Sequence, residues 1–183
     1  MTVGGNLLDY PFDIYTPTAG LTTAKMVING ILSTHATHCI ISDIKYFYLN
    51  TVMERYEYMH IHISIIPQEI VDQYNLLDLV DDNGWVYIEI QKGMYGFPQS
   101  GIIANKQLTK QLAPFGYRPT LHTPGLWKHD NPPLFFTLVV EDFLIKYEDI
   151  AHATHLLDVL HAEYPITTDW KASLYCGVTI KWD

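Results

Sequence analysis

The chain has 183 residues, of which 48% are hydrophobic and 17% are charged, so its composition is that of a folded globular protein rather than a disordered one. Its formal net charge of −9, with only 11 Lys and Arg residues, argues against strong nonspecific binding to nucleic acid, which normally needs a basic face. No apolar run approaches the length of a membrane span, and the first residues lack the basic start and apolar run of a signal peptide. We therefore expect one domain over residues 1–183, inside the cell, not secreted and with no membrane partner.

Hydrophobic periodicity predicts helices and strands along the first half of the chain. A nearly continuous apolar run over 39–44 is typical of a strand buried on both faces, and Asp43 lies close to its end. A carboxylate there needs solvent, a partner or a metal ion. The other predicted elements are a helix over about 17–33 that starts at Thr16 and Pro17, a strand at 56–63, a short helix within 67–79, a turn at 81–84 and a strand at 85–90.

The second half predicts a helix, a hairpin, a second helix and a closing strand. The elements are a Gly-rich loop at 92–101, a helix at about 102–113, a hairpin at 134–147, an amphipathic helix near 150–163 and a strand at 174–180. No internal repeat or linker interrupts this order. The pattern predicts an α+β fold with a mainly antiparallel sheet and helices packed on one face.

The hairpin at 134–147 places charge where turns usually have glycine. Its two apolar runs flank Glu141 and Asp142, which we expect at the tip, although tight hairpin turns favour Asn-Gly or Asp-Gly. Adjacent carboxylates repel each other unless a cation lies between them, so the pair is suited to a hard metal such as Mg2+. A solvated acidic turn is the simpler interpretation of the dipeptide alone. If the strand that carries Asp43 neighbours the hairpin, three carboxylates converge at one sheet edge as a site for hard divalent ions.

Three sequence blocks, in this order and spacing, resemble the reverse transcriptase domain of copia-type retrotransposons. The first is SDIKYFYLN at 42–50, similar to the family's Asp-Val-Lys-x-Ala-Phe-Leu-Asn motif. The second is GMYGFPQSG at 93–101, similar to its Leu-Tyr-Gly-Leu-x-Gln block. The third is VVED at 139–142, in place of the Tyr/Val-x-Asp-Asp signature. The resemblance covers essentially the whole chain and implies a polymerase palm with partial fingers and no thumb.

The resemblance also implies roles for individual residues. Asp43, Glu141 and Asp142 are the expected catalytic residues and metal ligands, holding two Mg2+ ions, or Mn2+ in their place. Tyr48 is expected to crowd the 2′ position of the incoming nucleotide. The expected nucleotide- and template-binding set is completed by Lys45, Gly96, Phe97 and Gln99. The implied activity is RNA-directed DNA synthesis, in which a primer 3′-hydroxyl attacks a deoxynucleoside triphosphate, and the implied partners are that nucleotide and an RNA or DNA primer-template.

The chain departs from the family pattern at several points. The first signature carboxylate is Glu141 rather than Asp, and one extra methylene moves the charge by about an ångström, a scale to which catalytic geometry is sensitive. The family's basic residues after the Gln block are replaced by Ile102, Ile103 and Ala104. The upstream basic strand, the thumb and the flanking integrase and RNase H regions of a polyprotein are expected to be absent. We therefore expect a degenerate copy with poor activity or none.

Two classes of function remain open. One is metal-dependent nucleotidyl transfer, and the other is a noncatalytic palm-like remnant or an RNA-binding module of similar topology. An RNA-binding sheet would need exposed aromatic and basic residues on its central strands, whereas residues 40 and 41 are aliphatic. The pairs His60/His62 and His152/His155 lack further zinc ligands at the usual spacing and are interpreted as ordinary histidines. The two cysteines, Cys39 and Cys176, are expected to be buried free thiols.

Overall fold

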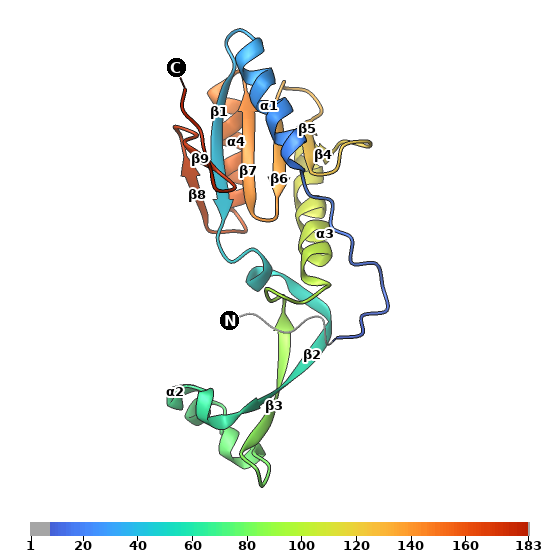
Figure 1. The fold of residues 1–183 in the computed structure, drawn as a ribbon, viewed down its shortest axis with the longest axis vertical. Coiled ribbons are helices and arrows are strands. Elements are labelled where there is room, and N and C mark those ends of the chain that lie inside the picture. The colour runs from blue at the N-terminus through green and yellow to red at the C-terminus, as the bar shows by residue number, and fades with distance from the viewer. Residues whose placement is uncertain (1–7, 183) are drawn as a thin grey trace.

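The computed structural model describes residues 8–182 and shows a helix-covered sheet from which a long two-stranded ribbon projects (Figure 1). The helices are α1 (Leu21–Ser33), α2 (Gln68–Gln73), α3 (Ser100–Leu112) and α4 (Ile150–His161). The strands are β1 (His38–Ile44), β2 (Val52–His62), β3 (Trp85–Lys92), β4 (Tyr117–Pro119), β5 (Leu126–His129), β6 (Phe135–Val139), β7 (Asp142–Tyr147), β8 (Ile166–Asp169), β9 (Leu174–Tyr175) and β10 (Val178–Thr179). Within residues 8–182, no helix is long and apolar enough to cross a bilayer.

The main sheet has six strands in the order β4-β5-β6-β7-β1-β8, and every neighbouring pair is antiparallel. Strands β2 and β3 form the separate ribbon, and β9 pairs with β10. This arrangement confirms the predicted α+β class with a mainly antiparallel sheet. The central strands β1 and β7 are apolar on both faces because each face of the sheet is covered.

Because side chains alternate along β1 and β7, these strands contribute residues to two separate hydrophobic cores, one on each face of the sheet. Ile40 and Ile145 pack on one face with α3 and α4, whereas Ile41 and Leu144 pack on the other face with α1 and the β9–β10 hairpin. Figure 1 shows α1 in front of the sheet and α4 behind it. The expectation of helices on one face therefore holds for α3 and α4, while α1 adds a helix to the second face.

The element boundaries correct three details of the sequence analysis. Helix α1 starts at Leu21 with Gly20 as its N-cap, so Thr16 and Pro17 precede it in an extended segment, residues 8–18, here called the strap. The hairpin turn is formed by Val140 and Glu141, because Asp142 already pairs with Val139 as the first residue of β7. The predicted strand at 174–180 is instead the β9–β10 hairpin, which reverses at Cys176 and Gly177, both with positive φ.

A close backbone approach at Gly125 holds the strap (residues 8–18) and the start of α1 against the sheet. The amide of Leu138 donates to the Gly125 carbonyl over 2.8 Å, and the amide of Ala19 donates to the Leu138 carbonyl over 2.9 Å. Gly125 has φ +70°, and a Cβ at this position would overlap the backbone of Thr18 and Ala19. Only glycine therefore fits both the conformation and the space.

We predict that Gly125→Ala lowers the free energy of unfolding by about 3 kcal/mol, because strain in the left-handed region adds to a clash with backbone that cannot move freely. Urea denaturation measures the change. The matched control is Gly20→Ala, where a Cβ meets nothing within 4 Å and the change of N-cap residue is expected to cost only about 0.5–1 kcal/mol. Equal losses in the two variants would contradict the proposed role of the junction.

Candidate functional site

Two predicted metal ligands, Asp43 and Asp142, lie directly opposite each other in the main sheet. Asp43 is the last residue but one of β1, Asp142 is the first of β7, and the two are Cα partners in the antiparallel ladder. Directly opposed residues project from the same face with Cβ atoms about 5 Å apart. Both side chains are partly buried on the α1 side of the sheet, where Ile41 and Leu144 also pack. The register thus brings together two carboxylates that are distant in sequence.

The third predicted ligand, Glu141, lies in the turn beside this pair. Its carbonyl accepts a hydrogen bond of 3.1 Å from the amide of Ile44, which fixes the turn to the end of β1. The turn begins at Val140 with φ +56°. A β-branched residue in the left-handed region is strained, and hairpins of this length usually have glycine or asparagine there. The strain is held by the pairing on either side of the turn.

The three carboxylates have pKa values above their ordinary range. Burial is the largest cause for each of them. The charge of Asp142 raises the pKa values of Asp43 and Glu141 further, and Asp43 also raises that of Glu141. Lys45 lowers the pKa of Asp43, and the Cys176 thiol lowers that of Asp142 by hydrogen bonding. A site that raises several carboxylate pKa values together favours either protonation or a cation.

Two tyrosines surround the Glu141 carboxylate. The Tyr95 hydroxyl donates to Oε1 of Glu141 over 3.4 Å, and the Tyr48 ring lies 4.8 Å from that of Tyr95. The other oxygen, Oε2, is buried and has no hydrogen-bond partner within residues 8–182. Burial and Glu141 raise the pKa of Tyr95 to about 12, so its phenol stays protonated. An unpartnered carboxylate oxygen in a partly buried site is able to accept a ligand.

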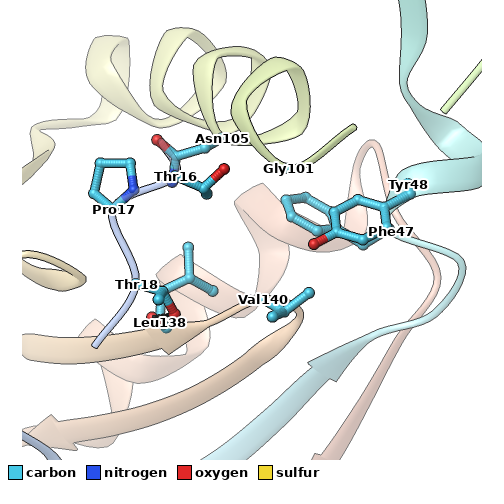
Figure 2. Close-up of a pocket in the computed structure, with 9 residues that line it drawn as sticks. All are labelled: Thr16, Pro17, Thr18, Phe47, Tyr48, Gly101, Asn105, Leu138 and Val140. Atoms are coloured by element: carbon cyan, nitrogen blue, oxygen red, sulfur yellow. Dashed lines mark hydrogen bonds between the residues drawn. The ribbon is translucent and has the colours of Figure 1, made fainter. Parts of the chain in front are cut away.

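Tyr48 also lines a small cavity of about 80 Å³ between the strap, α3 and the β6–β7 hairpin (Figure 2). In Figure 2, the Tyr48 and Phe47 rings lie at one side of this cavity, with Val140 below and Gly101 above. The lining consists of Thr16, Pro17, Thr18, Phe47, Tyr48, Gly101, Asn105, Leu138 and Val140. No carboxylate lines it, so Tyr48 approaches the acidic site through Tyr95 and not through a shared cavity.

The structure places the other four predicted binding residues in different surroundings. Lys45 is exposed beside Asp43, and Gly96 is exposed in a surface hollow next to the strap. Phe97 is buried with Met53 and Ile90 in a small core at the base of the ribbon. The Gln99 side chain is buried and donates to Glu57 over 3.0 Å. It lines a groove on the strap side of α3, which contains none of the three carboxylates.

Sequence analysis missed two residues of the site, Tyr95 and Cys176. Tyr95 stands inside the Gly-rich block, but nothing in the pattern indicates that its hydroxyl reaches Glu141. Cys176 was predicted to be a buried thiol and is instead exposed in the β9–β10 turn, with its Sγ 3.6 Å from Oδ2 of Asp142. Gly177 is the signal for that turn. Cys39 is also free and is partly buried.

The donors of this site have the chemistry that a hard divalent cation prefers, since they are carboxylates and one oxygen lacks a partner. The geometry of a metal site, however, is only partly present. Among residues 8–182, no three His, Cys, Asp or Glu side chains converge as a group that could hold a metal ion. The fold therefore brings Asp43 and Asp142 opposite each other, whereas Glu141 contacts Tyr95 and does not join them as a third ligand.

Comparison with known proteins found no matching protein-family model and no matching curated protein. Solved structures that match include an apo telomerase from Candida tropicalis truncated from its C-terminal domain, with 12% identity and a TM-score of 0.43 over 83% of this chain and 36% of that one. Another is a telomerase from Candida albicans in complex with a fragment of telomeric RNA, with 10% identity and a TM-score of 0.44 over 84% of this chain and 31% of that one. The chain thus spans about a third of each of these proteins.

We predict that Asp142→Asn raises the thermal midpoint at pH 7 by about 1–2 °C, equivalent to about 0.5 kcal/mol once solvent screening of these partly exposed groups is allowed for. The folded-state pKa values of Asp43 and Asp142 lie above their ordinary values, so ionisation destabilises the fold. The loss of stability caused by ionisation is absent at a pH below the ordinary, unfolded-state pKa values. It is complete at a pH above the raised, folded-state pKa values. The gain should therefore shrink as the pH is lowered from 7 toward 4.5.

Calorimetric melting curves over this pH range measure the effect. The control is Asp158→Asn on the exposed surface of α4, for which no gain is expected. A lower midpoint for Asp142→Asn at pH 7 would mean that the hydrogen bond from Cys176 outweighs the repulsion between the paired aspartates.

Proposed function

We propose that this chain is the palm and part of the fingers of a reverse transcriptase-like polymerase, descended from a copia-type element, with a site built for two-metal nucleotidyl transfer. The observation that carries the proposal is the direct opposition of Asp43 and Asp142 on neighbouring antiparallel strands. The three sequence blocks meet around it, because the first contains Asp43, the second contains Tyr95 and the third contains Glu141 and Asp142.

In this proposal, Asp43 and Asp142 supply the carboxylate oxygens for two Mg2+ ions, with Glu141 as a weaker third ligand. Bound in such a site, Mg2+ supplies charge stabilisation to the attacking and leaving oxygens of a phosphoryl transfer. The residues themselves hold the geometry: the β1–β7 ladder fixes the two aspartates, and the amide of Ile44 fixes the turn that carries Glu141. Tyr95 donates a hydrogen bond to Glu141, and the Tyr48 ring packs against Tyr95 on the same side of the site.

The proposed partners are a primer-template and a deoxynucleoside triphosphate. A neighbour in the comparison is a telomerase in complex with telomeric RNA, and the proposal extends an RNA template to this chain. Few cations are available to hold such a polyanion, since the chain has 11 Lys and Arg against 20 Asp and Glu. Binding should therefore be weak and should weaken further as salt increases.

A noncatalytic palm is the second candidate, and the orientation of Glu141 favours it. Its carboxylate contacts Tyr95, and the described side chains do not converge as a three-ligand group. A domain that retained its fold after losing catalytic activity would keep the two cores and the β1–β7 ladder. Its third carboxylate, Glu141, would no longer need to hold a ligand position. The two candidates differ in whether a primer is extended, since a palm that has lost turnover can still bind a divalent cation at the two aspartates.

We predict that Glu141→Asp increases the affinity for Mg2+ by about tenfold, because the shorter side chain withdraws from Tyr95 and joins the Asp43–Asp142 pair. Calorimetric titration with Mg2+ in the absence of nucleotide measures it. Asp142→Asn serves as the control that removes binding, and Glu148→Gln, an exposed residue after β7, should leave it unchanged. If Mg2+ binds neither the natural chain nor Glu141→Asp, the metal-dependent function is excluded.

The proposed activity is tested by primer extension on an RNA template with Mg2+. We expect trace extension by the natural chain, some increase with Glu141→Asp and none with Asp142→Asn. Displacing one electrostatic ligand costs about a hundredfold to a thousandfold in rate at comparable sites, so the assay needs long incubations at low salt. Robust extension by the natural chain would show that Glu141 is a competent ligand. Mg2+ binding without extension by either form would support the noncatalytic palm.

A further inference from the structure

Most of the net negative charge of the chain is concentrated in the outer part of the ribbon and in the segment that connects its two strands. Residues 56–91, here called the acidic lobe, contain no Lys or Arg and seven carboxylates, which gives −7 of the total −9. The seven are Glu57, Glu69, Asp72, Asp78, Asp81, Asp82 and Glu89. None of them makes an ion pair within residues 8–182. This lobe comprises most of β2, α2, the turn of 3-10 helix at Leu76–Leu79 and most of β3, and it extends away from the main sheet (Figure 1).

The acidic lobe forms most of a large apolar groove with a volume of about 820 Å³, whose lining is completed by Leu49, Lys92, Gly93 and Met94. The groove runs between β3 and the α2 region, and hydrophobic side chains form most of its surface. Several of them are widely exposed, including Tyr74 at 61%, Leu79 at 64% and Tyr87 at 68%. Exposed apolar surface of this kind, rimmed by polar residues, marks an interaction site.

One carboxylate in the groove is fixed in position and ionised. Glu89 lines the groove and accepts hydrogen bonds from the Tyr58 hydroxyl over 2.8 Å and from Nε2 of Gln91 over 2.7 Å. These bonds lower the pKa of Glu89, so it is charged at neutral pH. A carboxylate has lone pairs for further donors beyond these two. Glu89 is therefore oriented to accept a hydrogen bond from a Lys or Arg side chain lying in the groove.

We propose that the groove of the acidic lobe is a docking site for a basic amphipathic segment of a partner protein, with apolar side chains in the groove and Lys or Arg side chains against Glu89 and the other carboxylates of the lobe. Charge complementarity selects this occupant. A nucleic acid strand is a polyanion and would be repelled by seven carboxylates, against which the groove lining offers one cation, Lys92. A second copy of the chain would bring an equally acidic lobe against the first. A basic amphipathic helix complements both the apolar lining and the negative charge of the lobe.

The test uses fluorescence anisotropy with a labelled synthetic peptide that carries Leu at helical spacing and Lys elsewhere. The whole chain is titrated at low and at physiological salt. The comparison probes are the same Leu pattern with Glu in place of Lys, and a single-stranded RNA oligonucleotide. We expect the Lys peptide to bind, the Glu peptide and the RNA not to bind at this lobe, and the affinity for the Lys peptide to fall with salt.

Two variants of equal charge locate the interaction. The first combines Glu69→Gln, Asp78→Asn and Asp82→Asn in the acidic lobe, and the second combines Glu148→Gln, Asp158→Asn and Glu163→Gln around α4. All six residues are exposed, and both variants change the net charge by the same amount. The first should weaken peptide binding about tenfold, since exposed ion pairs contribute roughly a factor of two each, and the second should have little effect. Tyr74→Ser, which alters only the apolar lining, should weaken binding without changing its salt dependence.

Three outcomes would overturn the proposal. Equal loss in the two charge variants would mean that the peptide responds only to net charge. Binding of the RNA to the acidic lobe with an affinity equal to that of the peptide would make the lobe a nucleic-acid surface. Self-association in sedimentation that the first charge variant strengthens and the peptide reverses would identify a second copy as the occupant. None of these readouts depends on Mg2+ or on primer extension, so they remain separate from the proposed polymerase function.

Discussion

The pairing of β1 with β7 determines most of this structure. Six consecutive Cα partners, from His38 with Tyr147 to Asp43 with Asp142, hold the two strands in register. Because side chains alternate in a strand, a shift of one residue would exchange the faces of every side chain in one strand. It would move Ile145 away from the core of α3 and α4, Leu144 away from that of α1, and Asp142 away from Asp43. Burial on two faces therefore sets the relative position of the two aspartates.

The sequence was informative wherever burial produces a periodic pattern. The strand at 39–44, the helices at 102–113 and 150–163 and the hairpin at 134–147 all occur within a few residues of their predicted bounds. Asp43 and Asp142 were expected to meet, and the ladder places them opposite each other. The position of the hairpin turn was wrong by one residue, because the run Leu138 to Val140 is uniformly apolar and gives no local signal of where pairing ends. Only the register with β1 decides it.

Other features depend on contacts that a linear pattern does not encode. The contact between Tyr95 and Glu141 joins a loop to a turn 46 residues away, and the thiol of Cys176 reaches Asp142 through a hairpin that has only two residues in each strand. Gln99 was placed at the site by its motif, yet the structure buries its amide against Glu57 in β2. The net charge of the whole chain also does not show how the charge is distributed over the structure. With −7 in the acidic lobe, the remainder of the chain carries −2 (−9 minus −7), so the sheet and its helices are nearly neutral.

The edges of the two sheets differ in how well they are protected from pairing with other chains. One edge strand of the main sheet is β4, which has three residues including Pro119, and the other is β8, which has four residues. Short edge strands of this kind resist the addition of further strands. The ribbon has an eleven-residue strand, β2, that pairs only with β3 in the part of the chain from 8 to 182. Long two-stranded edges favour aggregation, and repulsion between carboxylates opposes it. The −7 charge of the acidic lobe, most of it in the connection between β2 and β3, therefore also acts as a solubility device, and high salt should promote edge-to-edge assembly of the purified protein.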